Sequence, residues 1–212
     1  MSPGGHPLAE PPEDPADLAD FPSVEKDRLP GLLFRIHRVE NDPAFFSDDE
    51  HGRFNPPPNS PAGFGTCYLS ISAVGAYVET FGRIGTVSQR QVDQRAVSAA
   101  SVSSDLRLAD MTAPTILGDW GLTADVGCGP DYGPTQRWAE RLYQANFHGI
   151  WYRARHDLGG GEDMRSVALF GGPGLRPDEL EFAFPGQRIP EDLISYCRRQ
   201  FGIVVLPTAS TA

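Results

Sequence analysis

The pattern of hydrophobic and polar positions predicts strands mixed with helices at irregular intervals. Short apolar runs, with alternation in some of them, predict strands at 32–37, 66–70, 102–108, 150–152, 167–170 and 203–206. Hydrophobic residues at helical spacing predict helices at 72–80, 114–122, 135–147 and 191–201. Because no regular strand–helix repeat runs through the chain, we predict an α+β fold. Its core is a mixed, mostly antiparallel sheet with flanking helices.

The first 28 residues differ in composition from the rest. They combine proline, glycine and acidic residues with few aromatic side chains, and residues 1–27 carry −6 of the formal net charge of −10. Such a segment buries too little apolar surface to offset the entropy lost on ordering. We therefore predict a disordered acidic leader over 1–28, one folded domain over 29–206 and a disordered tail over 207–212. The leader is either inert or a contact for a basic partner.

Composition argues against several classes of protein. No basic cluster is present to bind a phosphate backbone, so nucleic acid is not expected as a direct ligand. No apolar run approaches the ~18 residues of a membrane span, and the N-terminus lacks the features of a secretory signal. Cys67, Cys128 and Cys197 are far apart, and the five histidines show no ligand spacing, so no disulfide framework or metal site is expected. These features favour the reducing cytoplasm.

Three polar side chains are candidates for chemistry. Arg53 lies in a predicted loop, where a guanidinium can form two hydrogen bonds with a phosphate. Tyr68 offers a flat ring for stacking, and Glu79 could hydrogen-bond ribose hydroxyls and stabilise an oxocarbenium-like transition state. Each has an ordinary alternative: a surface ion pair for the arginine, core packing for the tyrosine and a solvated helix end for the glutamate.

Other motifs predict turns or exclude a class of enzyme. The glycine-rich segments 159–161 and 171–174 lack the Lys-Ser/Thr pair of a phosphate-binding P-loop and the strand-to-helix context of a dinucleotide fingerprint. Both are predicted to be turns. The motif Gly-X-Ser-X-Gly is absent from the chain, which argues against the simplest serine hydrolase.

Several short motifs occur in order between residues 33 and 170. They are Gly52-Arg53-Phe54-Asn55, Tyr68-Leu69-Ser70 with Ala76 and Glu79, residues 106–112, Thr135-Gln136-Arg137-Trp138-Ala139, and Gly149-Ile150-Trp151-Tyr152 followed by 167–170. Each motif alone is weak, whereas the ordered set is specific. Taken together, the set resembles the RES-domain family.

The resemblance implies a fold similar to that of ADP-ribosyltransferase toxins. It also implies an activity that degrades NAD by phosphorolysis or hydrolysis and releases nicotinamide. NAD would be the substrate and inorganic phosphate a co-substrate, with no prosthetic group. Such proteins are similar to the toxin half of bacterial toxin–antitoxin pairs, which implies a small helical antitoxin as partner. A homodimer is the default assembly.

The resemblance also implies roles for particular residues. Arg53 would bind the NAD phosphates, Tyr68 would orient the nicotinamide side, and Glu79 would stabilise positive charge on the ribose as the glycosidic bond lengthens. Asn55 and Ser70, which belong to the same motifs, would complete the binding set.

The chain departs from the family pattern at one position. The serine expected after the strand 150–152 aligns with Ala154, and loss of one hydrogen bond to a charged group weakens binding by roughly 1.5–3 kcal/mol. Arg153 or Arg155 could replace it as a phosphate ligand, Ser166 could reach in from the next strand, or the enzyme is slow. Two other functions therefore stay open: a mono-ADP-ribosyltransferase acting on a protein, and a catalytically weak module that binds NAD or an antitoxin.

Overall fold

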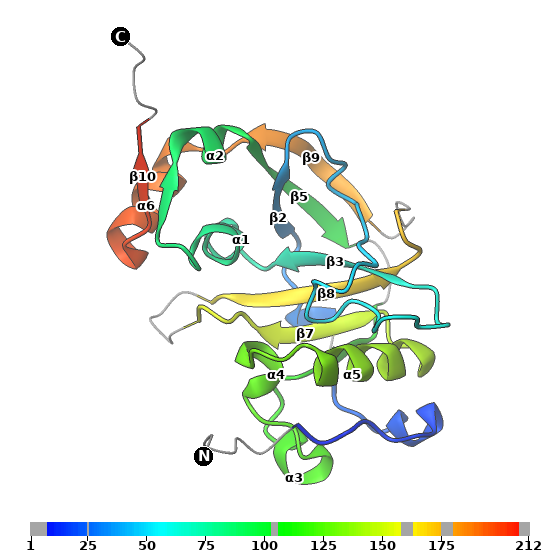
Figure 1. Ribbon diagram of the computed structural model, residues 1–212. Helices are drawn as coiled ribbons and strands as arrows, with labels where there is room; N and C mark the ends of the chain where they lie inside the picture. The colour runs from blue at the N-terminus through cyan, green and yellow to red at the C-terminus, as the bar shows by residue number, and fades with distance from the viewer. Residues whose placement is uncertain (1–7, 25, 103–105, 158–162, 175–179, 208–212) are drawn as a thin grey trace.

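The computed structural model describes residues 8–24, 26–102, 106–157, 163–174 and 180–207. Within these residues, an eight-stranded sheet with the order β1-β6-β7-β8-β3-β2-β5-β9 forms the centre of the fold (Figure 1). Neighbouring strands are antiparallel except for β6 and β7. The strands are β1 (Ser23–Val24), β2 (Leu33–Arg38), β3 (Gly65–Ser70), β5 (Arg95–Val102), β6 (Leu108–Asp110), β7 (Gly149–Arg153), β8 (Arg165–Gly171) and β9 (Leu180–Arg188).

Helices flank this sheet, and a small parallel sheet joins β4 to β10. These two strands are β4 (Thr86–Ser88) and β10 (Val204–Leu206). The α-helices are α1 (Ala73–Phe81), α2 (Gln89–Asp93), α3 (Ile116–Trp120), α4 (Asp125–Cys128), α5 (Gly133–Gln144) and α6 (Glu191–Phe201), and the 3₁₀ helices are η1 (Pro15–Leu18) and η2 (Lys26–Arg28). The predicted α+β fold with a mostly antiparallel sheet is confirmed.

Three apolar clusters fill the molecule. The first lies between α5, the N-terminal segment and β7, and includes Phe21, Trp138 and Ile150. The second lies on the opposite face of the central strands and includes Leu33, Trp151 and Leu169. The third packs α1 against α6 and includes Tyr77, Phe81, Ile194 and Cys197. Figure 1 shows the same arrangement, with α5 along β7 and α1 beside α6 at the other end of the sheet.

The sheet opens between β2 and β3. These two strands share one register pair, Phe34 with Ser70, whereas β2 pairs with β5 and β3 with β8 along their whole lengths. The chain passes from β3 directly into α1, and Ser72 caps that helix by accepting a 3.0 Å hydrogen bond from the Gly75 amide. The first turn of α1 is therefore fixed beside the opening.

The N-terminal segment corrects the predicted leader. Residues 8–24 are not a disordered extension: Leu18 is fully buried, Phe21 is almost so, and the Trp138 indole donates a 2.7 Å hydrogen bond to the Ala9 carbonyl. Arg137 forms two hydrogen bonds with the Glu10 carboxylate. The prediction failed because it used the average composition of the segment. That average gives little weight to Leu8, Leu18 and Phe21, which all reach the first apolar cluster. Residues 1–7 and 208–212 lie outside the described residues.

Other element boundaries also differ from the predictions. The predicted strand 102–108 is replaced by the end of β5 and by β6, and residues 103–105 lie outside the described ranges. The region 83–102, which has no clear period, contains β4, α2 and all of β5. Thr135, at which the predicted helix 135–147 begins, lies inside α5, where its hydroxyl contacts the carbonyls of Arg53 and Tyr132. The glycine segment 159–161 lies outside the described residues.

A buried histidine joins β2 to β5. His37 Nδ1 lies 2.8 Å from the Arg38 carbonyl oxygen, so Nδ1 carries the proton and donates. Nε2 lies 2.8 Å from Ser98 Oγ and accepts its hydrogen, and Ser98 Oγ in turn accepts a 2.7 Å bond from the Gly186 amide. Burial lowers the pKa of His37 below its ordinary value, and the bond to Arg38 opposes this shift only in part.

We expect His37 to make the free energy of unfolding depend on pH. Below about pH 6.5 the unfolded chain binds a proton at this position and the folded chain does not, so stability falls as the pH drops toward the lowered pKa. Urea unfolding at pH 7.5 and pH 5.5 should show a smaller loss for His37→Gln than for the wild type. Equal losses in the two proteins would contradict this assignment.

Candidate active site

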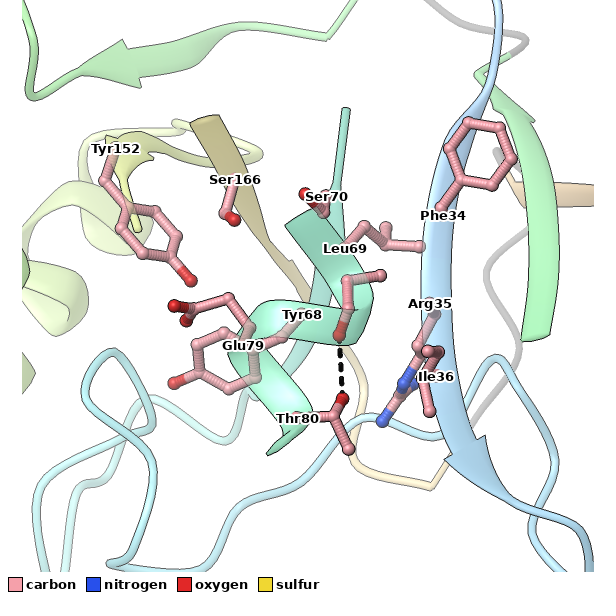
Figure 2. Close-up of a pocket in the computed structure, with 11 residues that line it drawn as sticks. Phe34, Arg35, Ile36, Tyr68, Leu69, Ser70, Glu79, Thr80, Tyr152 and Ser166 are labelled. Atoms are coloured by element: carbon pink, nitrogen blue, oxygen red, sulfur yellow. Dashed lines mark hydrogen bonds between the residues drawn. The ribbon is translucent and has the colours of Figure 1, made fainter. Parts of the chain in front are cut away.

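A cavity of about 280 Å³ lies where β2 and β3 diverge (Figure 2). Residues of β2, β3, α1, β7 and β8 line it: Phe34, Arg35, Ile36, Tyr68, Leu69, Ser70, Ala76, Glu79, Thr80, Tyr152 and Ser166. Three of the residues singled out from the sequence, Tyr68, Ser70 and Glu79, therefore meet in one cavity.

Tyr68 is fixed by its hydroxyl. The phenol oxygen accepts a 2.8 Å hydrogen bond from the Phe54 amide and donates a 2.9 Å bond to Asn55 Oδ1. Burial raises the pKa of this phenol well above its ordinary value, so Tyr68 stays neutral. The ring remains partly exposed. Tyr68 thus presents an uncharged aromatic surface to a ligand.

Close packing between α1 and β3 sets the position of Glu79. A Cβ atom on Gly75 would lie 2.2 Å from Ser70 Oγ, so the first turn of α1 approaches β3 as closely as glycine allows. Ser70 Oγ donates a 3.3 Å hydrogen bond to the Arg165 carbonyl. About one turn further along α1, the Glu79 carboxylate reaches the cavity on the side that faces Tyr152 (Figure 2).

Two lining residues from β7 and β8 received no role from the motifs. Burial raises the pKa of Tyr152 well above its ordinary value, and the Glu79 carboxylate adds to the effect. Ser166 is buried, and its hydroxyl lies beside the Tyr152 phenol and acts to lower the pKa of that phenol, but no hydrogen bond of ordinary geometry joins it to the described residues. The signal for Tyr152 was its place in the Gly149–Tyr152 motif, whereas Ser166 was only one of three alternatives.

Arg35 is the cation of this cavity, and sequence reasoning missed it. Its Nη1 donates to the carbonyls of Pro43 and Phe45, at 2.7 and 2.9 Å, and contacts Cys67 Sγ at 2.9 Å. All its hydrogen bonds within the described ranges use this one nitrogen, which leaves Nε and Nη2 for a ligand. The available signal was a charged residue inside the apolar run 32–37.

Arg53 lies behind the cavity rather than in its lining. Its carbonyl accepts a 2.7 Å bond from Thr135 Oγ1, its guanidinium lies 4.6 Å above the Tyr132 ring, and its side chain is buried. Nη1 has no hydrogen-bond partner among the residues described. Burial lowers the pKa of Arg53, and the positive charge of Arg155 adds to this effect. A buried guanidinium that lacks an acceptor favours a nearby anion.

Asn55 lies with Arg53 on the same loop and supports Tyr68. Besides the bond to the phenol, its Nδ2 donates a 2.8 Å bond to the Asp49 carbonyl. A Cβ atom on Gly52 would lie 2.2 Å from Asn55 Oδ1, which explains the glycine of the motif. Asn55 is almost fully buried and is not part of the cavity lining, so it acts on the cavity through Tyr68.

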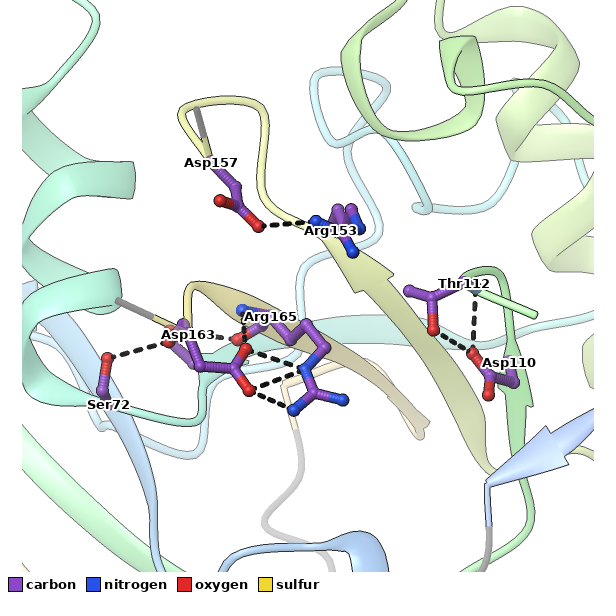
Figure 3. Close-up of polar contacts among 8 residues, drawn as sticks. Ser72, Asp110, Thr112, Arg153, Asp157, Asp163 and Arg165 are labelled. Carbon is purple, nitrogen blue, oxygen red and sulfur yellow. Dashed lines mark hydrogen bonds and ion pairs between the residues drawn. The ribbon is translucent and has the colours of Figure 1, made fainter. Parts of the chain in front are cut away.

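Arg153 and Arg155 belong to a second cavity, of about 660 Å³, lined mainly by residues 111–128. Arg153 lies 3.4 Å from Asp157 (Figure 3), and Arg155 Nη2 donates a 2.8 Å bond to the Cys128 carbonyl. Figure 3 also shows the Asp163–Arg165 ion pair and the contact between Asp110 and Thr112. The structure therefore does not bring Arg153 and Arg155 into the cavity of Tyr68 and Glu79.

Comparison with known proteins identifies the family. The model of the RES domain matches residues 32–185, which is more than half of the chain. The chain belongs to the RES-domain family. A chain of the crystal structure of the M. tuberculosis MbcT–MbcA toxin–antitoxin complex has the same fold, with a TM-score of 0.58 and 19% sequence identity. The match covers 82% of this chain and 89% of that chain. Among curated proteins, no sequence matches significantly.

The position of the family serine is occupied by a core residue in this RES domain. Ala154 is buried in the third apolar cluster and borders the second cavity. Of the three alternatives for the missing hydroxyl, Ser166 is the one that lines the cavity of Glu79. Its Oγ lies beside the Tyr152 phenol without a hydrogen bond of ordinary geometry, which leaves a donor and an acceptor for a ligand.

The described part of this RES domain has neither a metal-binding cluster nor a membrane-spanning helix. It contains no group of three or more histidine, cysteine, aspartate or glutamate residues that could hold a metal ion. None of its helices has the length and apolar character needed to cross a bilayer.

Proposed function

We propose that this RES domain breaks the bond between nicotinamide and ribose in NAD. The observation that carries the proposal is that the Glu79 carboxylate shares one cavity with the neutral Tyr68 ring and the Arg35 guanidinium. These are the groups that the reaction requires: a flat surface for nicotinamide, a cation for phosphate and an anion for the ribose. The RES family match supports the same activity.

Glu79 acts on the reacting ribose. As the glycosidic bond lengthens, its electron pair moves to the pyridinium nitrogen, nicotinamide leaves as a neutral molecule, and positive charge develops on the ribose ring. A fixed carboxylate stabilises that charge more strongly in the transition state than in the ground state. The incoming oxygen nucleophile then bonds to the anomeric carbon. Ser166, whose hydroxyl lines the cavity without a hydrogen bond of ordinary geometry, is proposed to orient that nucleophile.

Arg35 and Arg53 are proposed to have different roles in binding NAD. Arg35 lines the cavity and has nitrogen donors to spare, so we assign direct contact with the NAD phosphates to Arg35. Arg53, assigned this role by the family resemblance, lies deeper and is close enough to Tyr68 and Tyr152 to act on the pKa of both phenols, opposing the effect of burial. We propose that Arg53 contributes positive potential behind these rings. Asn55 holds Tyr68, and Ser70 bonds the end of β3 to β8 beneath the first turn of α1.

The acceptor is proposed to be inorganic phosphate or water. The chain of similar fold belongs to a toxin–antitoxin complex. We propose that this RES domain likewise acts as a bacterial toxin and that a small protein partner inhibits it. Transfer of ADP-ribose to a protein is the second candidate, because the same cavity chemistry leaves the nucleophile open.

An assay of nicotinamide release tests the proposal. Purified protein is incubated with NAD, with and without inorganic phosphate, and the ADP-ribosyl product is identified by mass. We expect release in the wild type, about a tenfold or greater loss in Arg35→Ala, and little change in the matched variant Arg38→Ala, whose side chain is 62% exposed on the same strand. If the wild type releases no nicotinamide, the proposed enzymatic activity is refuted. An ADP-ribosyl group found only on protein would favour the second candidate, transfer to a protein acceptor.

The substitution at Ala154 favours a further candidate, a module that binds NAD without turnover. In that case NAD would raise the melting temperature of the wild type while no nicotinamide appears, even after long incubation. Turnover in the wild type excludes this candidate.

A further inference from the structure

We infer that His156 is a positioning residue that fixes the Glu79 carboxylate for catalysis. The inference rests on the proposed function, because Glu79 is the residue assigned there to the ribose. His156 lies outside the motifs of the sequence and does not line the cavity of Glu79.

The contact between His156 and Glu79 is short, and both side chains are partly buried. His156 Nδ1 lies 3.0 Å from Glu79 Oε1, and the side chains are only 24% and 31% exposed. A glutamate near the end of a helix otherwise samples several rotamers. Holding Oε1 leaves Oε2 free to face the ribose in a defined direction.

The direction of this hydrogen bond does not depend on the charge of the imidazole. An ionised carboxylate only accepts hydrogen bonds, so Nδ1 must carry the proton, both in the neutral ring and in the imidazolium. The contact therefore specifies the Nδ1–H tautomer of the neutral ring. A neutral donor orients Glu79 without cancelling the negative charge that the transition state needs.

The position of the His156 ring is itself determined by two elements. A Cβ atom on Gly82 would lie 3.4 Å from His156 Cδ2, so the ring packs against the end of α1. On the other side, the Asp157 amide donates a 3.0 Å hydrogen bond to the Ala154 carbonyl and closes a turn directly after β7. Because β7 also carries Tyr152, one strand positions both the tyrosine and the histidine around Glu79.

A pair of variants separates hydrogen bonding from packing. In His156→Asn the amide nitrogen replaces Nδ1 as a donor, whereas His156→Leu fills the space without a donor. We expect the leucine variant to lose about 10- to 100-fold in kcat with KM for NAD changed by less than about threefold, and the asparagine variant to recover most of the rate. In a Glu79→Gln background, His156→Leu should cause little further loss.

An NMR measurement tests the inference first on the wild type alone, where nitrogen-15 shifts of His156 in the free protein should show the Nδ1–H tautomer. In a second sample, Glu79→Ala should remove that preference. An Nε2–H tautomer in the wild type would overturn the inference, as would wild-type kcat in the leucine variant or equal losses in the leucine and asparagine variants. Failure of the proposed function gives a different result: no nicotinamide release in the wild type.

Discussion

Glu79→Gln is expected to lower the rate of nicotinamide release by about 100- to 1,000-fold, the range seen when one preorganised electrostatic group is removed from an active site. Glutamine keeps the size of the side chain and an oxygen that accepts from His156 Nδ1, so the geometry of α1 is preserved. The charge that stabilises the developing cation is lost. The loss should therefore appear in kcat, with KM for NAD little changed.

The matched control is Glu40→Gln, which removes a carboxylate that is 58% exposed and does not line the cavity. Its rate and melting temperature should match those of the wild type. A Glu79→Gln protein that releases nicotinamide within about threefold of the wild-type rate would show that the carboxylate does not act on the ribose. A large fall in its melting temperature would instead indicate a structural role.

Trp138→Ala is expected to lower the free energy of unfolding by about 3–5 kcal/mol, the usual result of truncating a large buried aromatic residue. Trp138 is fully buried, and its ring lies 5.8 Å from the Phe21 ring and 6.4 Å from the Trp120 ring. Its indole also donates to the Ala9 carbonyl. The substitution therefore removes packing from the first apolar cluster together with the bond that holds the N-terminal segment.

Urea unfolding followed by circular dichroism measures this loss. Trp138→Phe is the companion variant, because it removes the indole donor and keeps most of the aromatic packing, so its loss should be clearly smaller. Limited proteolysis should cut residues 8–24 faster in Trp138→Ala than in the wild type. A loss below about 1 kcal/mol, with unchanged proteolysis, would contradict the assignment of this segment to the core.

Local pattern predicts much of the fold. The α5 helix has a strongly amphipathic sequence, and the central strands are short apolar runs, so their existence follows from residues close in sequence. The N-terminal segment was missed because its burial depends on Leu18 and Phe21 reaching a cluster that includes Trp138, Leu142 and Ile150, more than 100 positions away. The average composition of 28 residues does not show that two of them are buried by contacts with a distant part of the chain.

The candidate site was predictable only in part, and for a similar reason. Tyr68, Ser70 and Glu79 meet because a strand and the helix after it are adjacent in sequence. The choice between Arg35 and Arg53 depends on the opening between β2 and β3, which is a long-range feature. The direction in which a loop arginine points is not encoded in its spacing from other motifs. Both arginines were visible in the sequence, but only coordinates assign one to the cavity.

The N-terminal segment packs against α5 through the bonds of Trp138 to Ala9 and of Arg137 to Glu10. The folded domain is therefore longer than the segment that matches the family. The family match begins at residue 32, yet the first apolar cluster contains Leu18 and Phe21. At the other end the match stops at residue 185, before Ile194 and Cys197 of the third cluster. A polypeptide trimmed to the homologous segment would therefore expose two hydrophobic surfaces at once, and we expect it to aggregate where the whole chain stays monodisperse.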